Sequence, residues 1–322
     1  MNKLTKSLLI GAGVAATAAA ASYFTTKLLV NAAVEREVPE PLRNERMQNT
    51  LTGGPFADEE VWQRIDAAAE ILQNAEHETV ELTADDGVKL VGHWFWRPNA
   101  RRVIVAMHGW RSAWYRDFAL SAPFWLEHGC SVLFAEQRGQ NASGGDYIGF
   151  GLTERFDCRD WTEWVDDRCG GRLPIYLSGI SMGATTVLMA AGEPLPKNVH
   201  GIMADCGFTS PQAILKHVSN NNLHIAYGLY GGLVELLFKQ KLQRAADEYS
   251  TTEALANNTI PVLFVHGAND RFVPVEMTYE NYRACAGKKR LLIVPGAEHG
   301  MSFCVEEENY KNAVLSFWKE FD

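Results

Sequence analysis

The sequence lacks the residue patterns that mark several large classes of protein. Its 322 residues include six cysteines and nine histidines, yet it contains no C-x-x-C pair and no H-E-x-x-H segment. Without these spacings we expect neither a metal centre nor a disulfide framework. An excess of basic residues is lacking as well, since the formal net charge is −9. We therefore expect no nucleic-acid partner, because binding to phosphates requires a clustered basic surface.

A phosphate-binding loop is also missing. The segment 136–145 is rich in glycine, but it matches neither the G-x-G-x-x-G pattern of dinucleotide-binding proteins nor the Walker pattern. We therefore expect no nucleotide and no other cofactor. What remains is an ordinary globular composition, with 47% hydrophobic and 21% charged residues. A chain of this length is sufficient for one large α/β domain with an appendage.

Charge is absent from residues 7–26, directly behind Lys3 and Lys6. At about 1.5 Å per residue this run reaches roughly 30 Å, the hydrocarbon thickness of a bilayer. We expect residues 1–30 to anchor the chain in a membrane, with the body outside the cytoplasm because the two lysines favour the inner side. Two alternatives stay open. A run of four alanines offers cleavage sites for a signal peptide, and the weak hydrophobicity is compatible with a buried soluble helix in a cytoplasmic protein.

The next segment, 31–57, is polar and interrupted by proline and glycine, as a linker is; it either tethers the body or lies against it. Asp58 is a suitable N-cap for a helix that ends near residue 74. Residues 79–83 and 88–96 then alternate in polarity around an Asp-Asp-Gly turn and predict a hairpin. We place the main domain at 58–322.

Short apolar runs alternate with helical segments over most of this domain. Their spacing predicts an α/β fold with a mostly parallel, doubly wound sheet. Between residues 205 and 260 the alternation stops, and we expect a helical cap at about 207–256 that covers a substrate pocket. The predicted strands are residues 103–107, 131–135, 174–177, 199–204, 261–266 and 291–294.

The segment Gly-Ile-Ser-Met-Gly places Ser181 between an apolar run and a run of helix-forming residues. Strand, sharp turn and helix in this order are the context of a nucleophile elbow, in which the serine stands at the helix N-terminus. Glycines at the flanking positions allow the strand and the helix to approach each other closely. Ser181 is therefore the candidate nucleophile.

The loop after the 103–107 strand begins His-Gly-Trp. In hydrolases with such an elbow, one oxyanion donor is the N–H after the nucleophile, here Met182, and the other comes from the loop after the third strand, here Trp110. We interpret His108 as a structural residue.

Two further strands end in residues of catalytic type. The 261–266 strand leads into His-Gly-Ala-Asn-Asp, which contains Asp270, and the 291–294 strand leads into Ala-Glu-His-Gly, which contains His299. Parallel sheets build their sites at such carboxyl ends. Asp205 ends a neighbouring strand and is the alternative partner of the histidine. We choose Asp270, because its place after the strand before last is the usual acid position, and expect Asp205 to accept backbone N–H groups of its own turn.

With these motifs in register, the chain from about residue 79 to its end resembles the α/β-hydrolase superfamily. More narrowly it is similar to bacterial serine hydrolases described as membrane-bound or cell-surface proteins, including serine aminopeptidase-like ones, through Ser-Gly-Ile-Ser-Met-Gly-Ala-Thr-Thr-Val, Ala-Asp-Cys-Gly-Phe-Thr-Ser and Val-Pro-Gly-Ala-Glu-His-Gly. One departure is Gln140, where relatives commonly have histidine; it affects substrate detail and not the chemistry.

The resemblance implies a carboxylic ester hydrolase that forms an acyl-enzyme on Ser181, with a small-molecule acyl ester as its partner. A serine peptidase and an acyl-thioester hydrolase use the same triad, so both stay open. A catalytically silent surface-binding protein is the alternative outside the enzymes.

Overall fold

The structure is a computed structural model that describes residues 3–322, with the side chains of Thr17 and of residues 19–322. Its centre is an eight-stranded sheet in the order β1-β2-β4-β3-β5-β6-β7-β8. Strand β2 pairs antiparallel with β1 and with β4, and every other pair is parallel. The mostly parallel sheet and the predicted hairpin are therefore confirmed. The strands are β1 (Glu78–Thr83), β2 (Lys89–Phe95), β3 (Arg102–Met107), β4 (Cys130–Glu136), β5 (Ile175–Ile180), β6 (Val199–Asp205), β7 (Val262–Gly267) and β8 (Lys289–Val294).

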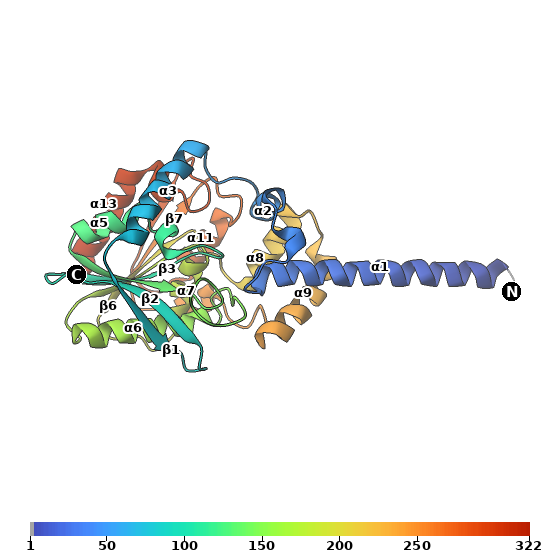
Figure 1. Ribbon diagram of the computed structural model, residues 1–322, viewed down its shortest axis with the longest axis horizontal. Helices are drawn as coiled ribbons and strands as arrows, with labels where there is room; N and C mark the ends of the chain where they lie inside the picture. The colour runs from blue at the N-terminus through green and yellow to red at the C-terminus, as the bar shows by residue number, and fades with distance from the viewer. Residues whose placement is uncertain (1–2) are drawn as a thin grey trace.

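Helices cover both faces of the sheet (Figure 1). On one face α3 (Glu59–Asn74), α5 (Ser121–Glu127) and α13 (Glu307–Phe321) bury a cluster that includes Trp125 and Trp318. On the other face α6 (Glu154–Cys169) and α7 (Met182–Ala190) bury a second cluster around Trp161. The central strands β3 and β4 are buried along their whole length because both faces are covered, which explains their continuous apolar sequence.

The N-terminal helix α1 (Lys3–Val34) projects from the side of the body, and its last turns lie along cap helix α9 (Figure 1). Side chains in these last turns are buried, including Val30 and Val34. Residues 1–2 and the side chains of residues 3–16, which carry the lysines of the anchor prediction, lie outside the described residues. Over the described part of the chain, no helix has the length and apolar character needed to cross a membrane.

The 31–57 segment is not a free tether. Helix α1 continues four residues past the predicted boundary at 30, and η1 (Glu40–Leu42) and α2 (Glu45–Thr52) follow. The segment lies against the body, because the Arg36 guanidinium donates to the Ser143 carbonyl at 2.7 Å and the Asn222 amide donates to the Leu51 carbonyl at 2.8 Å. Of the two arrangements expected for this segment, the packed one is present.

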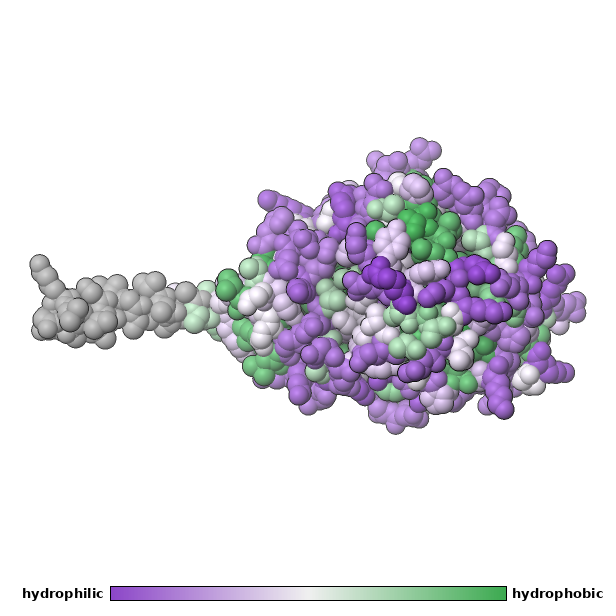
Figure 2. Space-filling view, turned by 180° about the vertical axis from the view of Figure 1, so that it is seen from behind, coloured by the Kyte–Doolittle hydropathy of each residue, from purple (hydrophilic) through white to green (hydrophobic). Residues whose placement is uncertain are grey.

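The predicted cap region is helical. It contains α8 (Pro211–His217), the π-helical turn η2 (Val218–Asn222), α9 (Tyr227–Leu242) and α10 (Thr251–Ala256). Helix α10 packs against α7 and α11 (Val275–Ala284) of the body, so only the first three elements stand over the sheet edge. Helix α9 buries Leu237 and Phe238 but leaves Leu229 79% exposed. Figure 2 shows a mostly hydrophilic face, on which hydrophobic residues gather in several groups.

Candidate active site

Ser181 stands in a strained turn between β5 and α7, with φ 57° and ψ −120°. The two flanking glycines are required by close backbone contacts. A Cβ on Gly179 would lie 2.2 Å from the carbonyl of Gly183, and a Cβ on Gly183 would lie 1.8 Å from the Met107 carbonyl oxygen. The turn therefore presses α7 against the ends of β5 and β3 and holds the serine hydroxyl at the helix N-terminus.

Three predicted side chains meet at the carboxyl edge of the sheet. Nε2 of His299 lies 2.8 Å from Oγ of Ser181, and Nδ1 of His299 lies 2.6 Å from Oδ2 of Asp270. The carboxylate of Asp270 can only accept, so Nδ1 donates to it and Nε2 accepts the serine hydroxyl proton. Ser181, Asp270 and His299 are 7%, 8% and 6% exposed, respectively, which keeps the chain of hydrogen bonds largely dry. This geometry suits proton transfer from the hydroxyl to the imidazole.

Asp270 is held by four groups. Its Oδ1 accepts the N–H groups of Phe272 and Val273 at 2.9 and 2.8 Å, while Oδ2 faces both His299 and His266. Burial acts to raise the pKa of this carboxyl, but the charge of His299 and the hydrogen bonds from both histidines outweigh it. The pKa of Asp270 is therefore held well below its ordinary value. The carboxylate is therefore ionised at neutral pH.

His266, the fourth partner, was not singled out in the sequence. It is fully buried at the end of β7, where Nε2 faces Oδ2 of Asp270 at 3.1 Å and the Val273 carbonyl at 2.9 Å. A carbonyl only accepts, so Nε2 carries a proton, and Nδ1 faces the Thr278 hydroxyl at 2.7 Å. His266 stands four positions before Asp270 in the segment His-Gly-Ala-Asn-Asp. This short spacing is the sequence feature that could have indicated the hydrogen bond between them.

The expectation for Asp205 is wrong in its detail. Its carboxylate does not accept N–H groups of its own turn; Oδ1 accepts from the hydroxyl of Ser302, which begins α12 (Ser302–Val305). The backbone carbonyl of Asp205 accepts from the Ser181 N–H at 2.8 Å. Burial raises the pKa of Asp205 to about 6, although the charges of His266 and His299 oppose the shift. Because Ser181 and Asp270 occupy both ring nitrogens of His299, Asp205 is not its partner.

The predicted oxyanion donors lie on both sides of Ser181. Met182 is the first residue of α7 and directly follows Ser181. Trp110 directly follows Gly109, and Gly109 lies so close to Ser181 that a Cβ added to it would be 3.4 Å from the Ser181 Cβ. Among the described residues, the backbone N–H groups of Trp110 and Met182 have no acceptor in the protein. Asp117 fixes the start of this loop, since its Oδ2 accepts from the Gly109 N–H at 2.6 Å. Both donors are thus available to a substrate oxygen.

The unusual Gln140 supports the same loop. Its side-chain oxygen accepts from the Arg111 N–H at 2.5 Å, and its buried amide nitrogen has no partner among the described residues. His108 is fully buried and accepts from the Gln137 N–H at 3.1 Å through Nε2. The interpretation of His108 as a structural residue therefore fits the geometry. Gln140 helps to hold the loop in position through its hydrogen bond with the Arg111 N–H.

The side chains of this loop bind the C-terminal end of α1, a contact that the sequence did not reveal. The Trp110 indole donates to the Ala33 carbonyl at 2.9 Å. The Arg111 guanidinium donates to three carbonyls of the same chain end, those of Ala32, Glu35 and Arg36. A cation suits this place because the last carbonyls of a helix lack partners and carry partial negative charge. Burial nevertheless lowers the pKa of Arg111 to about 10.

A cleft of about 520 Å³ opens above Ser181 and His299. Its walls carry polar groups from the loop and from α4 (Trp114–Asp117), including Arg111, Arg116 and Asp117.

Cys206, Asp270 and His299 bring three possible metal ligands within 4.8 Å of one another. This donor set fits a cation poorly, because burial raises the pKa of Cys206 well above its ordinary value and the other two side chains face each other.

Comparisons with known proteins show the family and the fold of the chain. The profile of the alpha/beta hydrolase family matches residues 103–311. The uncharacterized protein YqkD of Bacillus subtilis (strain 168) is 27% identical over 192 residues, which cover 60% of this chain and less than two thirds, 63%, of that protein. The bifunctional esterase/perhydrolase DCH of Acinetobacter calcoaceticus is 24% identical over 292 residues, which cover 73% of this chain and 98% of that protein. The Pyrococcus furiosus esterase Pf2001 shares the fold with a TM-score of 0.61 and 24% identity, over 78% of this chain and 95% of that one.

Proposed function

Because the chain belongs to the alpha/beta hydrolase family, we propose that it is a serine hydrolase that cleaves carboxylic esters. The observation that carries the proposal is the hydrogen-bonded series from Ser181 through His299 to Asp270 at the elbow. The esterase named among the relatives supports the ester as substrate class. Family membership by itself supports only a hydrolase, because one fold serves many substrates.

In the proposed reaction the Ser181 oxygen attacks the ester carbonyl while Nε2 of His299 takes the hydroxyl proton. Asp270 stabilises the imidazolium that forms, and the Trp110 and Met182 N–H groups bind the negative oxygen. The carbonyl then re-forms, the bond to the alcohol breaks, and His299 returns the proton to the leaving oxygen. Water repeats the same two steps on the acyl-enzyme and releases the acid, so the serine is regenerated.

A comparison of three substrate types tests the proposal. Esters, thioesters and aminoacyl anilides that carry the same acyl group are offered to the purified chain, and the ester is expected to have the highest kcat/KM. A clear preference for the anilide or the thioester would replace the esterase by a peptidase or a thioesterase on the same residues. Labelling of the folded protein by a fluorophosphonate at Ser181 is expected as well. Failure to label would favour a catalytically silent binding protein.

Location is a separate proposal that rests on the sequence alone. The uncharged run 7–26 behind Lys3 and Lys6 predicts an anchored body outside the cytoplasm, and no helix in the described residues supports the crossing. Protease added to intact cells is expected to remove activity from the membrane fraction. Full protection, with the activity in the soluble cytoplasm, would contradict this location.

A further inference from the structure

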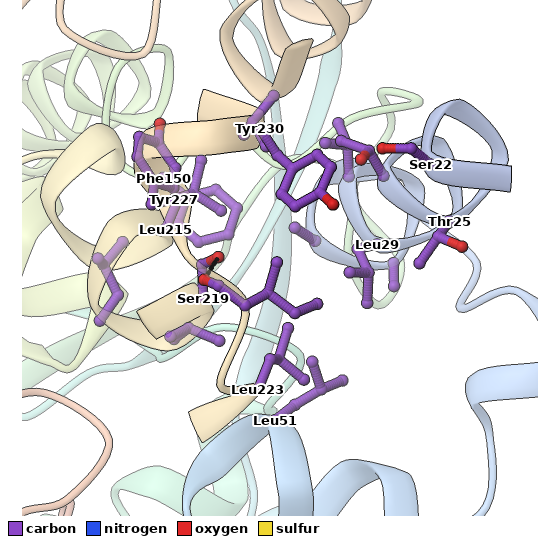
Figure 3. A pocket seen from close by; sticks show the side chains of 18 of the residues that line it. Ser22, Thr25, Leu29, Leu51, Phe150, Leu215, Ser219, Leu223, Tyr227 and Tyr230 are labelled. Atoms are coloured by element: carbon purple, nitrogen blue, oxygen red, sulfur yellow. Dashed lines mark hydrogen bonds between the residues drawn. The ribbon is translucent and has the colours of Figure 1, made fainter. Parts of the chain in front are cut away.

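A second cavity lies beside the cleft, between α1, α2 and the cap. Its volume is about 500 Å³, which is within the usual range for small-molecule sites. Figure 3 shows side chains from three directions around it: Leu29 on α1, Leu51 on α2, and Leu215 and Leu223 of the cap. Its walls are mostly apolar, although Ser22, Thr25, Thr26 and Tyr230 also line it. The hydroxyls of two other lining residues, Tyr227 and Ser219, have partners in Glu235 and the Ile225 carbonyl. Such a space suits a hydrocarbon group.

Trp110 and Phe272 line both the cavity and the cleft, so these two side chains form the boundary between the two spaces. Trp110 also supplies a proposed oxyanion N–H, and its indole is fixed on the Ala33 carbonyl of α1. Phe272 packs edge-on against the His299 ring, with ring centroids 5.0 Å apart. The ring centroids of Trp110 and Phe272 lie 6.4 Å apart, so an apolar chain that reaches from the reacting atoms into the space between α1 and the cap must part these two rings.

We propose that this cavity holds the acyl chain of the substrate, and that the ester is therefore one of a long-chain fatty acid. The proposal rests on the proposed function, since it assigns the substrate class of that same site. It also gives α1 a role in substrate selection. Helix α1 lies outside residues 103–311, so this wall is not supplied by the part of the chain that matches the family.

The position of His299 decides which end of the ester enters. His299 lines the cleft, whose walls carry both polar and apolar side chains, and does not line the apolar cavity. The leaving oxygen must lie beside Nε2 of His299 to take its proton, so the alcohol remains in the cleft among Arg111, Arg116 and Asp117. The acyl chain is then the part that passes Trp110 and Phe272 into the apolar cavity.

The test is a chain-length profile with p-nitrophenyl esters from acetate to myristate. With the unchanged protein we expect kcat/KM to rise by about three- to fourfold for each added methylene until the cavity is full, because each one leaves water. Acetate esters of increasingly long alcohols are the comparison series and are expected to show no such rise. A rise in the alcohol series instead would overturn the orientation and with it the proposal.

Two substitutions fill the cavity from opposite walls, Leu29→Trp on α1 and Leu215→Trp in the cap. We expect each to remove the rise with chain length while kcat/KM for the acetate stays within about twofold. Leu229→Trp is the matched control, since the same exchange on α9 affects a side chain that is 79% exposed and does not line the cavity. Thermal melting of all three variants establishes that they fold. Equal losses on acetate and myristate would refute an acyl site.

A binding measurement separates this proposal from the proposed function. Ser181→Ala cannot form an acyl-enzyme, so uptake of dansyl-undecanoic acid by this variant reports the cavity alone. We expect binding, and its loss when Leu29→Trp is added. If no ester is hydrolysed but this pattern is found, the esterase proposal fails and the acyl site stands. If esters are hydrolysed with a flat acyl profile and the fluorescent acid does not bind, the acyl site fails and the esterase stands.

Discussion

The sheet edge that carries Ser181 and the flank built by α1 and the cap hold their side chains in different ways. At the edge, each reacting group is buried and fixed by directed hydrogen bonds; Asp270 alone faces four donors. At the flank, the apolar side chains of Leu29, Leu215 and Leu223 line a space of about 500 Å³. Hydrogen bonds fix geometry to fractions of an ångström, whereas apolar contact fixes mainly volume. The edge is thus suited to chemistry and the flank to selection.

The sharpest test of this division is Ser181→Ala. We expect turnover of every ester to fall by about 10⁴- to 10⁶-fold, because the nucleophile is removed, while the melting temperature stays nearly unchanged. Activity is measured with acetate and myristate esters in parallel. Retention of even a tenth of the activity would mean that another residue attacks the carbonyl.

Asp270→Asn is expected to have the next largest effect. The amide keeps the shape of the carboxylate but favours the wrong tautomer of His299, and the same change in the serine-protease triad lowers turnover by about 10⁴-fold. Asp205→Asn is the matched control at the end of the neighbouring strand. Its amide oxygen can still accept from Ser302, so we expect it to remain active. The opposite pattern in stopped-assay rates would transfer the acid role to Asp205.

Arg111→Ala probes the contact between the two regions. It removes the donors to three carbonyls at the end of α1 and frees the loop that carries Trp110. Small displacements of oxyanion donors are costly, so we expect kcat to fall by about 10- to 100-fold for acetate as well as for long esters. Arg43→Ala, at an exposed arginine of the same N-terminal segment, serves as the control. Unchanged kcat in Arg111→Ala would mean that the edge does not depend on the flank.

The smallest expected effect concerns stability and pH. The pKa of Asp205 is about 6, above its ordinary value of 3.8, so the folded chain binds this proton more tightly than the unfolded chain. Its contribution to the free energy of unfolding therefore decreases as the pH rises from about 4 through 6, by on the order of 2 kcal/mol. Asp205→Asn lacks this decrease. Urea unfolding of both proteins at pH 4 and pH 8 measures the difference, and parallel curves would show that Asp205 titrates normally.

The sequence predicts an interaction well when a short segment carries the pattern, and poorly when the two partners lie far apart along the chain. Ser181, Asp270 and His299 were found because each follows a strand in a short segment, and parallel strands bring such ends together. The Asp205 to Ser302 hydrogen bond joins residues 97 positions apart, and no local pattern indicates it. The same holds for Arg111, whose partners at the end of α1 lie 75 to 79 positions earlier.

The flank shows a further limit of sequence patterns. The uncharged run at 7–26 was interpreted through its length and lack of charge, which predict a membrane segment. From Ala21 onward the same helix lies in the wall of a cavity, where Leu29 faces Leu215 and Leu223 across the space (Figure 3). The hydrophobicity of a segment indicates that its helix avoids water. It does not indicate whether the helix contacts lipid or the apolar surface of a protein.

The way in which α1 is held has a consequence for how freely this helix can change. Trp110 and Arg111 bind it through main-chain oxygens of residues 32, 33, 35 and 36, which every amino acid possesses. These hydrogen bonds are therefore independent of the side chains of α1, whereas the buried side chains of Val30 and Val34 add apolar contacts to the docking, and Thr25 and Leu29 line the cavity. Substitutions at Leu29 or Thr25 can reshape the cavity without loosening the attachment. Mutation or laboratory selection can therefore change the side chains of α1 that line the cavity, and so favour a new acyl group, while the residues around Ser181 stay the same.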